Sequence, residues 1–185
     1  MPQDTQISLL RKGYLYYKSQ IGENMINKLI DEMIKYYSKD PKRIQHFMKV
    51  HAFSKLIGEM ENIDKNILFT LETAAVVHDI GIKSAEEKYG NCSGKYQEEL
   101  GPDIAANMLA KLEFPKDIID RVTYLVGHHH TYTNIDGIDY QILVEADFLV
   151  NMYEDELSQA ACSSAITKIF KTSYGTKIAT EMFMG

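Results

Sequence analysis

Four polar side chains interrupt segments of the chain that are otherwise apolar: His46, His78, Asp79 and Asp147. His78 and Asp79 end the run "AAVVHD", and Asp147 lies inside "ILVEADFLV". Burying a carboxylate costs several kcal/mol unless it is paired or bound to a metal. Imidazole nitrogens and carboxylate oxygens are common ligands of divalent ions, so a metal would satisfy all four groups. We therefore predict a site for a divalent ion, which the sequence leaves open among Mn, Fe, Mg, Co, Ni and Zn, with coordination positions left for water and substrate.

A run of three histidines, residues 128–130, follows an apolar helical stripe that ends at Val126. Consecutive helical residues point about 100° apart, so all three cannot face one site. The stripe continues to His129, and His128 flanks the same side. We expect one or both to reach the site, where they could bind phosphate, act as general acid or ligate a second metal. The alternative is a helix end whose cations suit the helix dipole.

Three further features lie outside this set. Lys83 follows the His78-Asp79 pair and could neutralise phosphate charge, or could be a solvated lysine. The stretch "GNCSGKYQEELG", residues 90–101, is either a loop that covers the substrate or a plain connector. As a covering loop it would bind substrate through Lys95, Tyr96, Gln97 and Glu98. His51 fits no motif and is expected on the solvated surface.

Helical spacing of apolar residues predicts the elements that must position these side chains. A first amphipathic helix runs from about Ile21 to Tyr37. Asp40 reads as an N-cap before a second helix, which carries His46 and ends near Met60. Asp64 caps a third helix through "KNILFTLETAAVVH", which is expected to break at the glycine of "HDIG".

Four more helices are predicted in the second half of the chain. They begin around Pro102, at Pro115, after the turn "NIDG" with "DYQILVEADFLVNMYED", and at "SSAITKIF", before a short C-terminal piece. No alternating strand pattern occurs. The fold class is therefore all-α, a single-domain bundle of six to eight helices. We expect residues 1–40 to form an N-terminal helical segment packed on a core of residues 41–160, with a helical tail over residues 161–185.

The length, charge and cysteine content of the chain indicate which classes of protein it can belong to. The chain has 185 residues, of which 45% are hydrophobic, as in one globular domain. Its formal charge is −6 and its basic residues are scattered, which disfavours duplex nucleic acid as a partner. Cys92 and Cys162 form no CxxC pair, and no signal peptide or membrane-length apolar run is evident. We expect a reduced, cytoplasmic protein without membrane contact, and a homodimer is left open.

The order His46, then His78 with Asp79, then Asp147 resembles the HD-domain superfamily of metal-dependent phosphohydrolases. The segments "RIQHFMKV", "AAVVHDIGIK", "VGHHHTYTNIDGIDYQILVEADFLVN" and "IFKTSYG" are similar to small bacterial HD proteins known as predicted hydrolases. The resemblance implies an HD-type helical bundle and an enzyme that cleaves a small phosphorylated molecule or a nucleotide with metal-activated water.

In the mechanism that this resemblance suggests, Asp79 orients the attacking water, while His128 or His129 and Lys83 stabilise developing negative charge. No GYP triplet follows the histidines, so the substrate of the cyclic-di-GMP phosphodiesterases is not implied. Two other functions stay open. One is a di-iron oxygenase, which would need both His128 and His129 to bind a second iron. The other is a non-catalytic regulatory module that binds a nucleotide without cleaving it.

Overall fold

The helices begin where side chains can accept hydrogen bonds from free backbone amides. In the computed structural model, which describes residues 22–185, the Asp40 side chain accepts from the N–H of Arg43, and the Asp64 side chain accepts from the N–H of Asn66. Both predicted N-caps are therefore confirmed. Residues 1–21, part of the predicted N-terminal segment 1–40, lie outside the described residues.

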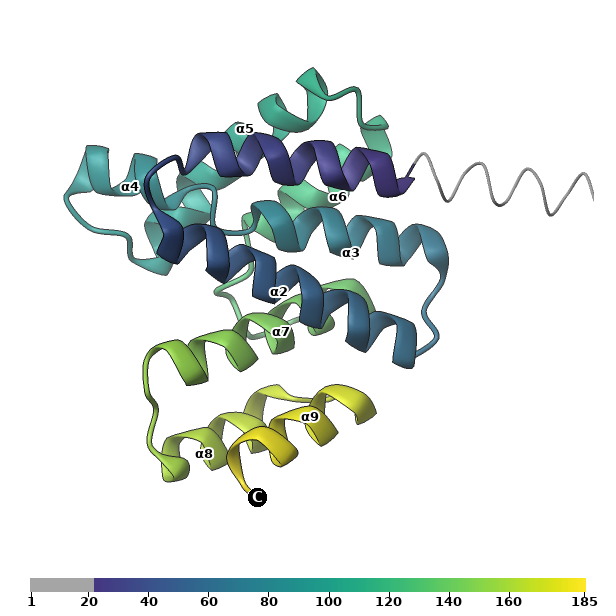
Figure 1. The fold of residues 1–185 in the computed structure, drawn as a ribbon, viewed down its shortest axis with the longest axis vertical. Helices are drawn as coiled ribbons and strands as arrows, with labels where there is room; N and C mark the ends of the chain where they lie inside the picture. Colours follow the sequence, from purple (N-terminus) through teal and green to yellow (C-terminus); the bar gives the residue numbers. More distant parts are fainter. Residues whose placement is uncertain (1–21) are drawn as a thin grey trace, which may run out of the picture.

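The described part of the chain contains helices joined by turns and loops and no strand, which confirms the all-α prediction (Figure 1). A helix over residues 22–36 is followed by α2 (Pro41–Met60), α3 (Lys65–Val77), α4 (Ile82–Tyr89), α5 (Gly94–Lys111), α6 (Lys116–Val126), α7 (Ile138–Glu154), α8 (Gln159–Ile169) and α9 (Ser173–Phe183). Among these elements, none is both long and apolar enough to cross a lipid bilayer.

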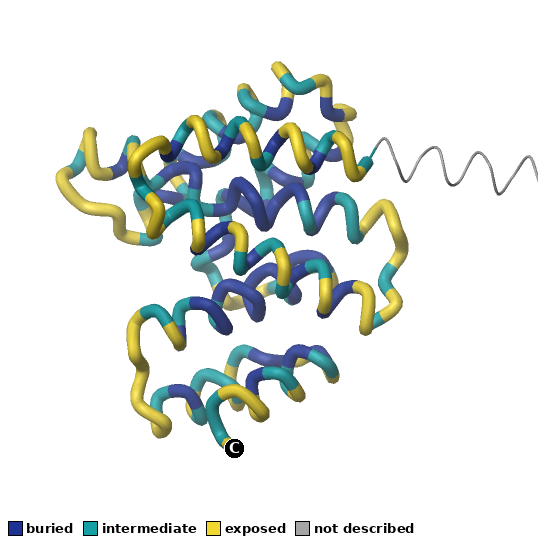
Figure 2. The backbone as a smooth tube through the Cα atoms, in the orientation of Figure 1, coloured by how far each residue is buried: buried dark blue, intermediate teal, exposed yellow. Residues whose placement is uncertain are grey.

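The core forms where α3 and α7 pack against α2, with α6 on the other side of α3. The second half of α3 and most of α7 are buried on every side (Figure 2). A helix that is apolar all round belongs in the centre of a bundle. His78, Asp147 and their neighbours therefore lie at the centre of the fold, where polar groups need partners.

The segment that follows His78 and Asp79 has a different secondary structure from the one predicted. Residues 82–89 form α4, which has one buried residue, Ala85, and so no apolar periodicity that could predict it. Helix α5 begins at Gly94 and not at Pro102, so residues 94–101 are helical, and the prediction of a loop over residues 90–101, either covering the substrate or a plain connector, is wrong for most of its length. Pro102 lies inside the helix, where it removes one hydrogen bond, and packing of α5 on α6 outweighs this cost.

Gly81 is part of the turn formed by residues 78–81, which we call the HD turn. It does not mark the end of the helix, as was predicted. Helix α3 ends at Val77, and Gly81 has a right-handed φ of −72°, which any residue can adopt. A Cβ atom at Gly81 would lie 2.7 Å from the carbonyl oxygen of Gln97 and 3.0 Å from the amide nitrogen of Gly101. Gly81 is therefore required for close packing of the HD turn against α5.

The predicted short C-terminal piece is the helix α9, and a buried carboxylate holds its start. Glu145 on α7 accepts hydrogen bonds from the backbone N–H of Lys171 at 2.6 Å and of Thr172 at 2.9 Å, and from the Thr172 hydroxyl. Glu145 is completely buried. These hydrogen bonds hold the start of α9 against α7, at the centre of the bundle.

We expect Glu145→Ala to lower the free energy of unfolding by about 3 kcal/mol, because four donors lose their acceptor: the backbone N–H groups of Lys171 and Thr172, the Thr172 hydroxyl and the Gln141 amide. For a domain of this size, that loss corresponds to a decrease in melting temperature of roughly 6 to 12 °C. Thermal unfolding followed by circular dichroism measures it. The exposed Glu181→Ala in α9 serves as the control and should melt like the wild type. Equal melting temperatures for the two variants would contradict an anchoring role for Glu145.

Candidate metal centre

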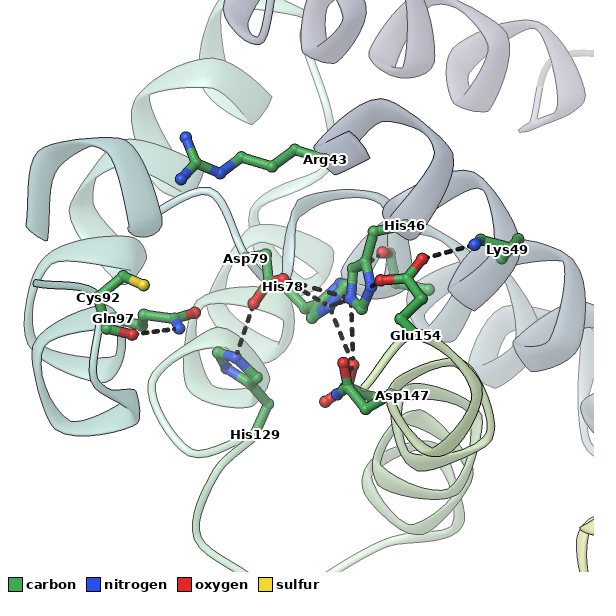
Figure 3. Close-up of polar contacts among 12 residues, drawn as sticks. Arg43, His46, Lys49, His78, Asp79, Cys92, Gln97, His129, Asp147 and Glu154 are labelled. Carbon is green, nitrogen blue, oxygen red and sulfur yellow. Dashed lines mark hydrogen bonds and ion pairs between the residues drawn. The ribbon is translucent and has the colours of Figure 1, made fainter. Parts of the chain in front are cut away.

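The fold brings the four predicted metal ligands together from three parts of the chain. His46 projects from α2, His78 and Asp79 lie at the end of α3, and Asp147 projects from the middle of α7 (Figure 3). The Nε2 atom of His46 lies 3.2 Å from that of His78 and 3.2 Å from Oδ1 of Asp147. His46 and Asp147 are almost fully buried, and His78 is completely buried.

The spacing of these atoms fits a shared divalent ion. Oδ2 of Asp79 lies 3.3 Å from Nε2 of His46 and 3.4 Å from Nε2 of His78, and Oδ1 of Asp147 lies 3.6 Å from the latter. Ligands about 2.1 Å from one ion are about 3.0 Å apart at right angles and about 3.4 Å apart at the tetrahedral angle. The residues present therefore suit a metal.

Hydrogen bonds to the far side of each imidazole orient the rings. Nδ1 of His46 lies 3.0 Å from Oε2 of Glu154, and Nδ1 of His78 lies 2.8 Å from the carbonyl oxygen of Ala75. A carbonyl or carboxylate oxygen accepts only from a protonated Nδ1. In a neutral ring this leaves the lone pair on Nε2, which is the atom that faces the cluster. Both rings are thus held in the tautomer that a metal ligand needs.

The electrostatics of the cluster favour a cation. Burial would lower the pKa of His78, but the charge of Asp79 and hydrogen bonds to Asp147 and Asp79 outweigh it and raise that pKa well above the usual value. Burial would raise the pKa of Asp147, yet hydrogen bonds to His46 and His78 hold it well below its usual range. Burial would also raise the pKa of Asp79, but the charge of His78 and hydrogen bonds to His129 and His78 lower that pKa well below its usual value. Both carboxylates are therefore ionised, and binding of a metal would release protons from the histidines.

Asp79 also faces a second group of possible ligands. Its Oδ1 lies 3.4 Å from Nε2 of His129, whose Nδ1 is 2.8 Å from the carbonyl oxygen of Val126. Ligand atoms of Asp79, His129 and His130 lie within 4.8 Å of one another. The Nε2 atoms of His129 and His130 are buried without a hydrogen-bond partner. Burial, with the charge of His129 next, lowers the pKa of His130 to about 4, so this ring is neutral and able to ligate.

His130 was missed from the sequence because helix α6 ends at Val126. Residues 127–130, which we call the histidine turn, are not helical, so the angular rule for a helix does not apply to them. His128 belongs to neither ligand group. Its Nδ1 lies 2.7 Å from the carbonyl oxygen of Tyr124, and its ring stacks on that of Tyr124 with centroids 4.2 Å apart.

The four residues predicted to contact substrate lie in the first turns of α5, in the order Lys95, Tyr96, Gln97, Glu98. Lys95 is exposed, and Tyr96 stacks on Tyr89 with ring centroids 4.0 Å apart. Gln97 is buried and donates from Nε2 to the carbonyl oxygen of Cys92 at 2.9 Å. Oε1 of Glu98 accepts from the N–H of His130 and from the hydroxyl of Thr131, both at 3.0 Å, so Glu98 holds the histidine turn.

Lys83, predicted to neutralise phosphate charge or to be solvated, and His51, predicted on the surface, both have specific partners. Nζ of Lys83 lies 5.4 Å from the centre of the Tyr36 ring, in a cation–π contact that does not involve the four ligands. The prediction that His51 is a solvated surface residue is wrong. Its side chain is 13% exposed and its Nε2 lies 3.0 Å from Oε1 of Glu72, a residue of α3 that the helical pattern of α2 could not reveal.

Glu154 is a residue of the site that sequence reasoning missed, although it lies two turns after Asp147 on the same side of α7. It contacts Nδ1 of His46 and also accepts from Nζ of Lys49 at 2.5 Å. Figure 3 shows it beside His46, on the side opposite Asp79. Such partners set the orientation and basicity of a ligating histidine.

We expect Glu154→Gln to weaken metal binding about 10- to 100-fold, because the amide no longer holds the His46 ring as a charged acceptor does. Titration of the metal-free protein with Mn²⁺ or Zn²⁺ measures the dissociation constant. The control is Glu156→Gln, which removes the same charge at an exposed position that does not contact His46. This variant should bind the metal as tightly as the wild type. If the two variants bind metal equally, Glu154 does not support His46.

The comparisons with known proteins agree with this arrangement. Residues 43–164 match the family model described as HD domain. The structure is similar to the crystal structure of a predicted HD superfamily hydrolase from an uncultured Thermotogales bacterium, with a TM-score of 0.59 and 24% sequence identity over 88% of this chain and 84% of that chain. A comparison with curated proteins gave no match. The matched region contains all four ligands and the histidine turn.

Proposed function

Because this chain belongs to the HD domain family, we propose that it is a metal-dependent phosphohydrolase that cleaves a small phosphate ester or a nucleotide. The observation that carries the proposal is the convergence of the His46 and His78 Nε2 atoms and of oxygens from Asp79 and Asp147 at spacings suited to one ion. This set would hold a divalent cation and leave coordination positions open, as catalytic sites require.

A divalent ion bound there supplies a Lewis acid for the phosphoryl group and activates water. Asp79 presents one oxygen to the ligand cluster and the other toward His129, so it can accept a hydrogen bond from the attacking water and orient it. The Nδ1–H of His129 donates to the carbonyl oxygen of Val126, and its Nε2 has no hydrogen-bond partner. A protonated Nε2 can therefore donate its proton to the leaving oxygen. Lys83 has no part in this scheme, since its ammonium group contacts Tyr36.

The test combines metal analysis of the purified protein with phosphate release from a mixed panel of nucleotides and sugar phosphates, measured with added Mn²⁺, Mg²⁺, Fe²⁺, Co²⁺, Ni²⁺ or Zn²⁺. We expect about one or two ions per chain and release of phosphate that a chelator abolishes. A metal-loaded protein that releases no phosphate from any compound, and returns a bound nucleotide unchanged, would instead support the non-catalytic module.

A second candidate function rests on the group formed by Asp79, His129 and His130. Two buried Nε2 atoms without partners beside a carboxylate could bind a second ion, with Asp79 as the bridge. Two irons held in this way would suit the di-iron oxygenase alternative, and two other divalent ions would suit a two-metal phosphohydrolase. Iron content together with oxygen consumption separates the two.

A further inference from the structure

Two consecutive tyrosines at the end of the helix over residues 22–36 donate hydrogen bonds to the HD turn. The hydroxyl of Tyr37 donates to the carbonyl oxygen of Asp79 at 2.6 Å, and the hydroxyl of Tyr36 donates to the carbonyl oxygen of Ile80 at 3.1 Å. Both tyrosines precede residue 43, where the match to the HD domain family model begins. A part of the chain outside that match therefore holds the turn that carries a candidate ligand.

The HD turn joins α3 to α4, so its carbonyl groups need partners from outside a helix. The carbonyl oxygen of Asp79 accepts from the backbone N–H of Ile82 at 3.0 Å in addition to the hydroxyl of Tyr37. A carbonyl oxygen has two lone pairs, so both acceptor positions of Asp79 are used. Because a buried carbonyl group that loses its donor is costly, the two hydroxyl groups favour this conformation of the turn.

The side chain of Tyr37 is itself held in place. Tyr37 is 3% exposed and belongs to the hydrophobic core together with Leu29 and Met33 of the preceding helix. The rings of Tyr36 and Tyr37 meet edge-on with centroids 4.9 Å apart, and the guanidinium group of Arg43 lies 5.7 Å from the centre of the Tyr37 ring. A donor with so little freedom fixes the position of its acceptor.

The position of this backbone matters because the carboxylate of Asp79 contacts two groups of ligands at once. Its Oδ2 lies 3.3 Å from Nε2 of His46, and its Oδ1 lies 3.4 Å from Nε2 of His129 (Figure 3). Tyr37 fixes the peptide group that follows Asp79, and close packing of Gly81 against α5 fixes the end of the turn. The direction in which the Asp79 side chain leaves the backbone is then set. A displacement of about 1 Å in a site can lower its activity by about 100-fold.

We infer that Tyr37 is a positioning residue of the candidate metal centre, supported by Tyr36. Neither residue is a ligand; their hydroxyl groups hold the backbone of the HD turn so that the carboxylate of Asp79 reaches its partners. The inference rests on the metal site of the proposed function and not on the reaction proposed there. It makes the end of the helix over residues 22–36 a working part of the metal centre.

The test removes one hydroxyl group at a time and keeps the aromatic ring. Metal-free Tyr37→Phe, titrated with Mn²⁺, should bind the ion about 10-fold more weakly than the wild type, the lower end of the effect of partners outside the ligand shell. The absorption spectrum of bound Co²⁺ should also change, because its bands depend on the coordination geometry. Tyr36→Phe should show a smaller change in the same direction, since its hydrogen bond is longer and lies one residue after the ligand. The control is Tyr174→Phe in α9, which should bind both ions like the wild type.

Thermal unfolding followed by circular dichroism separates positioning from stability. If Tyr37→Phe melts at a lower temperature but, while folded, binds Mn²⁺ as tightly as the wild type and gives the same Co²⁺ spectrum, its hydroxyl group is merely structural and the inference is wrong. If Tyr37→Phe does not fold, the same two measurements on Tyr36→Phe decide. Weaker metal binding by the variants of a protein that hydrolyses no phosphate compound rejects the proposed reaction and supports the inference, whereas a wild type that binds no divalent ion rejects both.

Discussion

The Asp79→Asn variant is expected to retain little bound metal and to release phosphate more than about 100-fold more slowly than the wild type. Asp79 is the residue that contacts most of the site, with Oδ2 near Nε2 of His46 and of His78 and Oδ1 near Nε2 of His129. Loss of a partner outside the ligand shell already costs about 10- to 100-fold, and a direct ligand contributes more. Metal content per chain and steady-state phosphate release measure the two effects.

The exposed Asp103→Asn on α5 provides a matched control, because it makes the same chemical change away from the ligands. Circular dichroism should show equal helicity for both variants, since an asparagine fills the same space as the aspartate. Should Asp79→Asn keep metal at the stoichiometry of the wild type, Asp79 would have a merely structural part and the proposed function would lose its central residue.

The second large effect is expected at the histidine turn. We expect His129→Ala to lower turnover by about 10- to 1000-fold, the usual range for one acid–base or electrostatic group. The reason is that Nε2 of His129 faces Asp79, is buried, and has no other partner. Turnover of His128→Ala should stay near that of the wild type, because its ring contacts Tyr124 and not the ligands.

Metal analysis of the same two variants decides between one and two ions. Unchanged occupancy in His129→Ala assigns this residue to proton transfer or charge stabilisation. Occupancy that halves together with activity places His129 in a second metal site, and the two-metal alternative then replaces the single-ion scheme. A loss of turnover in His128→Ala as large as that in His129→Ala would contradict the division of roles between the two rings.

The sequence by itself determined the class of fold and the residues of the candidate ligand set. Asp40 and Asp64 predicted helix starts because a short carboxylate before an apolar repeat can satisfy free backbone amides. His46, His78, Asp79 and Asp147 stood out because a polar group on an apolar helical face is costly unless it has a partner. Both patterns depend only on residues close together in the sequence. They can therefore be recognised without knowing how distant parts of the chain pack.

The tertiary structure decided which other groups join this set. Glu154, Glu98 and His130 reach the site only because α2, α5 and the histidine turn pack beside α3 and α7. Helical periodicity gives the face of each helix but not the distance between helices, nor the geometry of a turn after a helix ends. For the same reason, the early start of α5 could not be predicted, since its packing against α6 outweighs the local cost of a proline within the helix.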